Sequence, residues 1–313
     1  MNVVFMGTPD FAAGILCAVA DAGYHITGVV TQPDRPRGRK KEILPGPVRC
    51  EAEKRGIPVY QPLKVRAEEA VEEIRKMEPD LIIVAAFGQI IPRSILTMPI
   101  YGCINVHASL LPAYRGAAPI QRAILDGCDV TGVTIMRMNE GLDTGDIISQ
   151  REVTITGETT GGSLFDELAR EGASLLLDTI PSIVDGSAVY TPQPEKSTTA
   201  YASLIKKEHG CIDWSLDAVS IERMTRALSP WPSAWTTMDG RLLKIWKAHV
   251  EKRDSEGSAE ETGRIVRQDA RGLYIQCGRG ILAAEELQLE GRRRMTAGEF
   301  LRGYTIRNNV LGQ

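Results

Sequence analysis

Short apolar runs that end in glycine or a polar residue recur along the first part of the chain, as buried parallel strands do. They occupy residues 2–7, 25–31, 80–88 and 102–107. Stretches with helical spacing separate them, among them residues 67–77. This alternation predicts an α/β fold with a doubly wound, mostly parallel, Rossmann-like sheet. Strands at 131–138 and 145–155 are expected to continue the sheet, and a helix at 163–184 to close the domain.

The pattern changes after residue 189. Two prolines and many small polar residues over 190–208 predict a linker. From 209 to 313, one short helix at 221–228 is followed by strands at roughly ten-residue spacing, a pattern typical of an OB-like β-barrel. We therefore expect a Rossmann-like domain over 1–189 and a smaller β-barrel domain over 209–313.

Composition restricts the class of protein. Six cysteines are present without a CxxC pair, so neither a zinc site nor a disulfide framework is expected. No basic leader precedes the first strand, and no apolar run reaches about 18 residues, so a cytoplasmic protein without a membrane span is expected. The net charge is −3, yet from Lys206 onward 18 Lys and Arg face 15 Asp and Glu. This slight basic excess hints at a polyanionic partner.

Ligands of open parallel sheets bind beyond the carboxyl ends of the strands. Gly7, Thr31, Gly88 and His107 should all lie at that edge, with Thr8 capping the first helix. The first loop reads GTP rather than GxGxxG, and GxxxxGK[ST] does not occur. These absences argue against a nucleotide-dependent oxidoreductase and a P-loop NTPase.

Two polar residues end the apolar strand at 102–107. Asn105 and His107 are two apart, so their side chains should point to the same face. They could simply be satisfied polar groups that close a strand. Asp143, in the glycine-flanked stretch NEGLDTGDI, could be an ordinary turn residue or could orient His107 for acid–base chemistry.

A longer motif favours chemistry. The segment NVHASLLPAYRGAAPI (105–120), with the aspartate of GLDTGDI, resembles the formyltransferases that use 10-formyltetrahydrofolate. The segments GTPDFA, TQPDRPRGRKKEILPGPV, AAPIQRAI and PWPSAW resemble the members of that family that act on methionyl-tRNA. The similarity extends over residues 2–303, nearly the whole chain.

The resemblance implies an enzyme of translation initiation. It would transfer the formyl group of 10-formyltetrahydrofolate, its co-substrate, to the free amino group of methionyl initiator tRNA, without a metal. In that reaction Asn105 would donate its amide N–H to the oxyanion of the tetrahedral intermediate, and His107 would move protons. Asp143 would orient His107, and the division of labour between these two residues is left open.

The resemblance also implies a folate site. The segment Ser109, Leu110, Leu111 and Pro112 would form an apolar wall for a flat ligand, and the backbone near Gln89, Ile90 and Ile91 would meet the pterin. Without the resemblance, these residues read as ordinary hydrophobic core. Arg115 could orient the loop, meet an anionic substrate or be a solvated surface residue.

For tRNA, the implied contacts are basic residues. The basic loop RPRGRKK (35–41) would grip acceptor-stem phosphates with five residues: Arg35, Arg37, Arg39, Lys40 and Lys41. A run of charges can also be a solvated face. The C-terminal domain would add Lys244, Lys247 and the arginines of GRRRM (291–295). Trp231 and Trp235 could stack on bases, but a packed domain anchor is the favoured interpretation. A monomer is expected.

Two alternatives stay open. The same chemistry could serve an amino-sugar or small-amine N-formyltransferase or a formyltetrahydrofolate hydrolase, but these acceptors would not require the basic loop and the C-terminal barrel. A non-catalytic RNA-binding protein on an enzyme fold would not require Asn105, His107 and Asp143 together.

Overall fold

A computed structural model describes residues 1–37, 42–256 and 261–312. The chain forms two compact units. The first comprises Met1–Pro119, Val130–Thr154 and Phe165–Ala202, and the second Ile120–Asp129, Ile155–Leu164 and Ser203–Gln313. Among the described helices, none combines the length and apolarity that crossing a lipid bilayer requires.

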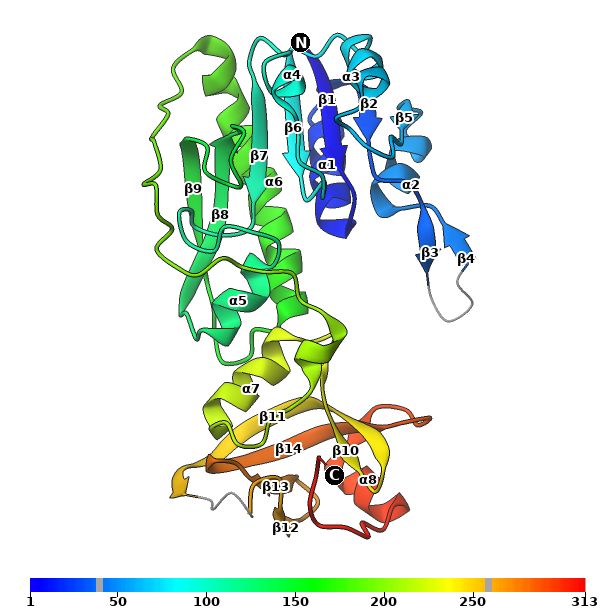
Figure 1. Cartoon of the computed structure of the whole chain (residues 1–313), viewed down its shortest axis with the longest axis vertical. Coiled ribbons are helices and arrows are strands. Elements are labelled where there is room, and N and C mark those ends of the chain that lie inside the picture. The colour runs from blue at the N-terminus through cyan, green and yellow to red at the C-terminus, as the bar shows by residue number, and fades with distance from the viewer. Residues whose placement is uncertain (38–41, 257–260, 313) are drawn as a thin grey trace. The chain divides into compact units, whose positions relative to one another are not determined.

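The first unit is built on a seven-stranded sheet in the order β5-β2-β1-β6-β7-β8-β9 (Figure 1). Its strands are β1 (Asn2–Gly7), β2 (His25–Val30), β5 (Val59–Tyr60), β6 (Leu81–Ala85), β7 (Cys103–His107), β8 (Val130–Arg137) and β9 (Ile147–Thr154). The five strands from β5 to β7 are parallel, which confirms the mostly parallel α/β sheet predicted from the sequence.

One of the last two strands, β8, runs against the predicted direction. β8 is antiparallel to both β7 and β9, so it interrupts the parallel order, and β9 again runs in the direction of β7. The segment between β8 and β9 is the short turn 138–146, and a parallel connection needs a crossover of a dozen or more residues. The apolar pattern of a strand does not encode this direction.

Helices cover both faces of the sheet. One face carries α1 (Asp10–Asp21) and α6 (Gly161–Asp185), and Gly172 of α6 lies so close to β7 that an added Cβ would be 2.8 Å from a Val106 methyl. The opposite face packs against α3 (Glu68–Arg75) and α4 (Arg93–Leu96) through a buried apolar cluster. Because strand side chains alternate, Cys103 belongs to that cluster while Val106 faces α6.

The loops at the carboxyl edge of the sheet are tied together. The sequence predicted that Thr8 caps α1, but Pro9 occupies the N-cap position instead. The Thr8 hydroxyl instead donates to the Phe87 carbonyl at 3.1 Å, and the Gln32 amide donates to the same oxygen at 2.9 Å. The loops that follow β1 and β2 are therefore both bonded to one carbonyl in the loop that follows β6. Helix-capping rules do not anticipate this long-range contact.

The stretch read as a basic loop contains a hairpin. β3 (Arg35–Arg37) pairs antiparallel with β4 (Glu42–Leu44), and α2 (Pro47–Lys54) follows. In Figure 1 this hairpin stands out from the seven-stranded sheet. The residues that connect its two strands, 38–41, lie outside the described residues.

The second unit is an antiparallel sheet in the order β10-β11-β14-β13-β12, with β15 paired to β14. Its elements are α5 (Pro119–Leu125), η1 (Lys207–Gly210), α7 (Ala218–Ala227), β10 (Ala234–Met238), β11 (Arg241–Glu256), β12 (Ile265–Gln268), β13 (Leu273–Gln276), β14 (Arg279–Leu289), β15 (Met295–Thr296) and α8 (Ala297–Gly303). The expected small C-terminal β-domain is thus observed, and α7 overlaps the helix predicted at 221–228.

Asp217 caps α7, and its contribution to stability should depend on pH. Its carboxylate accepts from the Ser220 hydroxyl at 2.7 Å and from the Ser220 N–H at 2.9 Å, and these bonds lower the pKa of Asp217 below its ordinary value of 3.8. Asp217→Ala should lower the free energy of unfolding by about 1 kcal/mol at pH 7.

A depressed folded-state pKa contributes stability above the unfolded value and loses it as the pH falls. The difference between wild type and Asp217→Ala should therefore shrink below pH 3.8. Urea unfolding from pH 7 to pH 3 measures it, with Asp217→Asn as a capping-competent control. A difference that does not change with pH would contradict this account.

Candidate functional site

Asn105 and His107 lie where the sequence placed them, on one face of β7 at the carboxyl edge of the sheet. Their exposed fractions are only 8% and 7%. Cys103 shares the face, but burial raises the pKa of its thiol to about 12, so it is protonated and unreactive at neutral pH. Within the described part of the chain, no group hydrogen-bonds to the Asn105 side-chain amide, which leaves its N–H groups for a ligand.

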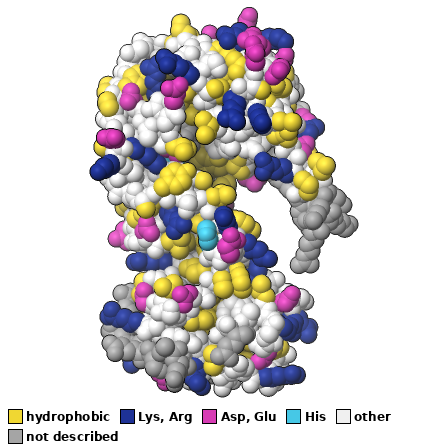
Figure 2. All heavy atoms as spheres, viewed as in Figure 1, with side chains coloured by type: hydrophobic (Ala, Val, Ile, Leu, Met, Phe, Trp, Pro, Cys, Tyr) yellow, Lys and Arg dark blue, Asp and Glu magenta, His cyan; other side chains and the backbone are white. Residues whose placement is uncertain are grey.

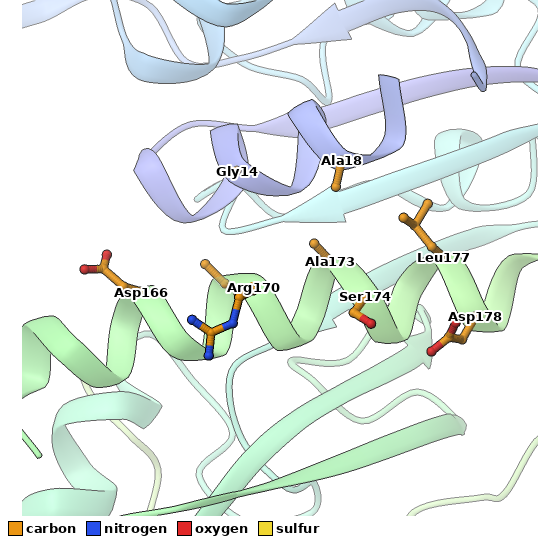
Figure 3. A pocket seen from close by; sticks show the side chains of 9 residues that line it. Gly14, Ala18, Asp166, Arg170, Ala173, Ser174, Leu177 and Asp178 are labelled. Carbon is orange, nitrogen blue, oxygen red and sulfur yellow. The ribbon is translucent and has the colours of Figure 1, made fainter. Parts of the chain in front are cut away.

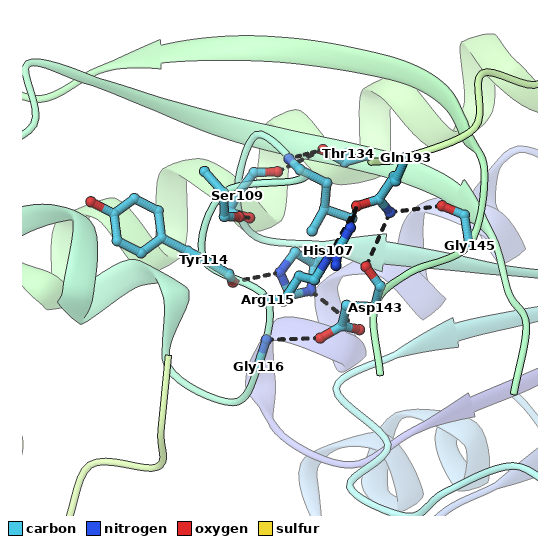
Figure 4. Close-up of polar contacts among 11 residues, drawn as sticks. His107, Ser109, Tyr114, Arg115, Gly116, Thr134, Asp143, Gly145 and Gln193 are labelled. Atoms are coloured by element: carbon cyan, nitrogen blue, oxygen red, sulfur yellow. Dashed lines mark hydrogen bonds and ion pairs between the residues drawn. The ribbon is translucent and has the colours of Figure 1, made fainter. Parts of the chain in front are cut away.

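The His107 ring lies between two partners. Its Nε2 is 3.1 Å from the carbonyl oxygen of Tyr114. A carbonyl can only accept a hydrogen bond, so Nε2 carries a proton. The other nitrogen, Nδ1, is 3.8 Å from Oδ1 of Asp143 (Figure 4), beyond hydrogen-bond distance. In the neutral ring, a proton on Nε2 leaves the lone pair on Nδ1, the nitrogen that faces the Asp143 carboxylate.

Asp143 is held by its own turn. Its φ of +53° lies in the left-handed region, which aspartate tolerates better than most residues. Its Oδ2 accepts from the Gly116 N–H at 2.9 Å, so Oδ1 is the oxygen that faces His107. The structure thus brings together all three residues that were predicted to be catalytic, from β7 and from the turn before β9.

Arg115 is a buried residue, only 6% exposed. Its guanidinium donates to the carbonyls of Pro194 and Glu195 at 2.8 and 3.1 Å, and to Oε1 of Gln193 at 2.8 and 3.1 Å. Through these hydrogen bonds, the Arg115 side chain ties the loop after β7 to residues 193–195. Of the three possibilities that the sequence left open, loop orientation agrees with this burial, and a solvated surface residue does not.

Sequence reasoning missed Gln193. It lies in the stretch read as a linker, yet its amide donates to the carbonyls of Asp143 and Gly145 at 3.0 and 2.7 Å (Figure 4). Residues 190–202 belong to the first unit and contact the loop after β7. A proline-rich polar stretch predicts a linker by composition, and only a long polar side chain between two prolines hinted otherwise.

The segment predicted to contact folate is held by hydrogen bonds to Ala113 and to Thr134 of β8. The Ser109 hydroxyl donates to the Ala113 carbonyl at 2.6 Å, and the Leu111 N–H donates to Thr134 Oγ1 at 3.0 Å. Ser109 and Leu111 are buried, whereas Leu110 and Pro112 are half-buried. The first pair therefore shapes the loop, and the second pair is more accessible to a ligand.

Gln89 and Ile90 line a cavity of about 430 Å³ at the carboxyl edge of the sheet, but Ile91 lies in the apolar core. The Ile90 side chain is 74% exposed, as few isoleucines are. The other lining residues are Gln32, Pro33, Arg35, Leu63, Lys64, Arg66 and Gly88. Three cations and two exposed apolar side chains thus surround this cavity.

Of the five basic residues predicted to grip tRNA from the segment 35–41, the side chain of Arg35 alone can be described, and it is exposed. Arg37 lies in β3, and Arg39, Lys40 and Lys41 lie outside the described residues. In the view of Figure 2, Lys and Arg side chains are interspersed with Asp and Glu rather than gathered into one stripe.

The C-terminal candidates show the same mixing. Lys247 pairs with Glu285, Arg293 with Glu299 and Arg294 with Glu286. Lys244 and Arg294 lie 5.3 and 5.1 Å from the ring centre of Trp246, which places these two cations beside one aromatic ring. The sequence favoured a packed domain anchor as the role of the two tryptophans of PWPSAW. This interpretation is wrong for Trp231, which is 60% exposed, whereas Trp235 is half-buried.

A second cavity, of about 590 Å³, lies between α1 and α6 (Figure 3). Small and apolar side chains dominate its lining, with Asp166, Arg170 and Asp178 among them. It opens on the face of the sheet opposite His107 and contains none of the predicted site residues. Within the described chain, no three His, Cys, Asp or Glu side chains are grouped to hold a metal ion.

Gly116 allows the close packing that places its N–H against Asp143. Its φ is +122°, and an added Cβ would lie 2.7 Å from the Ala202 carbonyl and from the Tyr201 ring. Gly116→Ala should lower the free energy of unfolding by about 1–3 kcal/mol, because the backbone must shift. Urea unfolding measures it.

Gly14→Ala is the matched control. An added Cβ at Gly14, within α1, meets no atom within 4 Å, so this substitution should instead stabilise the protein by about 0.5–1 kcal/mol. Equal stabilities for Gly116→Ala and wild type would show that the loop absorbs the methyl group freely.

Comparisons with known proteins agree on one family. The family described as formyl transferase matches residues 1–180, and the family described as formyl transferase, C-terminal domain, matches residues 204–305. The methionyl-tRNA formyltransferase of Agathobacter rectalis is 52% identical over 97% of this chain and 96% of its own. That of Bacillus licheniformis is 49% identical over 96% and 95%.

Solved structures share the fold at much lower identity. WlaRD, a sugar 3N-formyl transferase solved with dTDP and 5-N-formyl-THF, is 18% identical with a TM-score of 0.66, covering 94% of this chain and 99% of its own. HypX from Aquifex aeolicus in complex with tetrahydrofolic acid is 18% identical with a TM-score of 0.62, covering 96% and 47%.

Proposed function

The chain belongs to the formyl transferase family, and we propose that it transfers the formyl group of 10-formyltetrahydrofolate to the amino group of methionyl initiator tRNA. The products are formylmethionyl-tRNA and tetrahydrofolate, and the reaction serves translation initiation in the cytoplasm. Folate is the co-substrate, and a monomer is sufficient because every proposed residue comes from one chain.

One observation carries the proposal about the acceptor. Identity to methionyl-tRNA formyltransferases is about half of all positions and extends over both units of the chain. The sugar formyl transferase matches 94% of this chain in fold but only 18% in sequence. On the sequence alone, the C-terminal domain is an argument for a tRNA acceptor. Because a sugar formyl transferase matches nearly the whole fold, a second unit does not distinguish the two acceptors, and the sequence identity favours tRNA.

The geometry supports a direct attack of the amine on the formyl carbon. The Asn105 amide would donate to the oxyanion of the tetrahedral intermediate, a contact that can lower a barrier by ~2.7–4 kcal/mol. As the new C–N bond forms, the amine proton moves to Nδ1 of His107, the nitrogen with the free lone pair. The Asp143 carboxylate then stabilises the imidazolium. When the bond from carbon to N10 breaks, His107 Nδ1 passes this proton to N10, so that tetrahydrofolate leaves and the neutral imidazole is restored.

The cavity beside Gln89 and Ile90 suits the folate. Folate has flat aromatic parts and an anionic glutamate tail. The exposed apolar side chains of Leu63 and Ile90 could pack against a ring, and Arg35, Lys64 and Arg66 could attract the carboxylates. We assign Leu110 and Pro112 to the same ligand, since they are the accessible members of their segment.

The first experiment tests the acceptor. Purified protein receives 10-formyltetrahydrofolate with methionyl initiator tRNA, a UDP-amino-sugar and water as competing acceptors. We expect formylmethionyl-tRNA as the main product, whereas formylated sugar or free formate would overturn the proposal. In the same assay His107→Ala should lower kcat by ~10²-fold or more with folate binding retained. His25→Ala is the control, because His25 begins β2 at the opposite edge of the sheet.

A second experiment tests the acceptor-stem contacts. Removing the positive charge of Arg35, Arg37, Arg39, Lys40 and Lys41 should weaken tRNA binding and reduce the dependence of affinity on salt, since each lost phosphate contact removes released counterions. Dissociation constants at several salt concentrations measure both. A variant with Arg35 and Arg37 alone neutralised is compared with one that neutralises Lys54 and Lys76, which are exposed on α2 and beyond α3, so that each loses two positive charges. An unchanged affinity and salt slope would exclude the hairpin from tRNA binding.

A further inference from the structure

Residues 190–202 hold the loop after β7 from outside. The Ser197 hydroxyl donates to the Pro112 carbonyl at 2.6 Å, and the Tyr114 N–H donates to Thr199 Oγ1 at 2.7 Å. The Ala202 N–H donates to the Arg115 carbonyl at 2.8 Å. This segment is therefore packed along the loop that supplies the Tyr114 carbonyl to His107.

Gln193 is the member of this segment with the most contacts to the site. Its two N–H groups face the carbonyls of Asp143 and Gly145, and its Oε1 accepts twice from Arg115. A side-chain amide has two donor hydrogens and an oxygen with two lone pairs, and all four are used here. Such a fully satisfied, half-buried amide fixes the position of each group it contacts.

The contacts close a circuit around His107. Nε2 bonds to Tyr114, whose neighbour Arg115 bonds to Gln193; Gln193 bonds to the backbone of Asp143, whose carboxylate faces Nδ1. The partners on the two sides of the imidazole ring are thus connected through one amide. Displacing Asp143 would change the separation from Nδ1, which is already 3.8 Å.

We propose that Gln193 is a positioning residue of the active site, which holds the Asp143 turn in register with the Tyr114–Arg115 loop so that the carboxylate faces His107 Nδ1. Only the expected effect on kcat rests on the proposed function. Gln193 does not touch the reacting atoms; it acts through Asp143 and Arg115.

The test uses two variants of the full chain and one control. Gln193→Met keeps the length of the side chain and removes every hydrogen bond. Gln193→Glu keeps the acceptor for Arg115 but points a carboxylate oxygen at two carbonyl oxygens. Thr198→Ala, on an exposed neighbour in the same segment, is the control. The readouts are kcat and KM for formyl transfer, and the ¹⁵N chemical shifts of the His107 ring nitrogens, assigned by their loss in His107→Ala.

We expect Gln193→Met to lower kcat by about tenfold or more, as small misplacements of catalytic groups do, with KM for both substrates changed less than threefold. The His107 shifts should move, and the control should match wild type. Gln193→Glu should be impaired as well, because retaining Arg115 does not restore the contact with the Asp143 turn. A general loss of folding would instead appear in circular dichroism and would move the signals of the other histidines.

Unchanged His107 shifts in both variants, or a kcat within twofold of wild type in Gln193→Met, would overturn the proposal. Full rescue by Gln193→Glu would also overturn it, because Arg115 alone would then be the relevant contact. If wild type formylates no tRNA, the proposed function fails, while the His107 shifts still decide whether Gln193 positions the ring and its partner.

Discussion

A buried carbonyl oxygen decides how His107 can act. The Tyr114 carbonyl only accepts, so it keeps a proton on Nε2 and leaves Nδ1 as the nitrogen that can take up another. The Asp143 carboxylate faces that same nitrogen. The tight approach at Gly116, the left-handed turn at Asp143 and the packing of residues 190–202 keep these two partners on opposite sides of one ring.

Much of this arrangement follows from local pattern. The apolar run at residues 2–7 is β1 to the residue, and the helical spacing at 163–184 is α6 within two residues at each end. The two-residue spacing of Asn105 and His107 placed both side chains on one face, and the rule for open parallel sheets placed that face at the ligand edge. Such inferences succeed because alternation in a strand and the direction of parallel strands are properties of short segments.

What the sequence could not supply depends on distant partners. The hydroxyl of Thr8 has a choice between its own helix and the Phe87 carbonyl, and tertiary contact decides it. The direction of β8 depends on which strand it pairs with, and its apolar pattern is the same either way. Gln193 lies in a stretch whose composition predicts a linker. The residues near it in the sequence do not indicate its partners Arg115 and Asp143, which are 78 and 50 positions away.

The segment that carries Gln193 also affects how the protein can be divided. Composition puts the end of the first domain at Val189, whereas the packing of the first unit extends to Ala202. A fragment that stops at the compositional boundary would retain every side chain proposed to touch the reacting atoms and lose those that hold them. A fragment that ends after the first unit, or a chimera that exchanges the C-terminal part of the chain, should therefore be cut after Ala202 rather than after Val189.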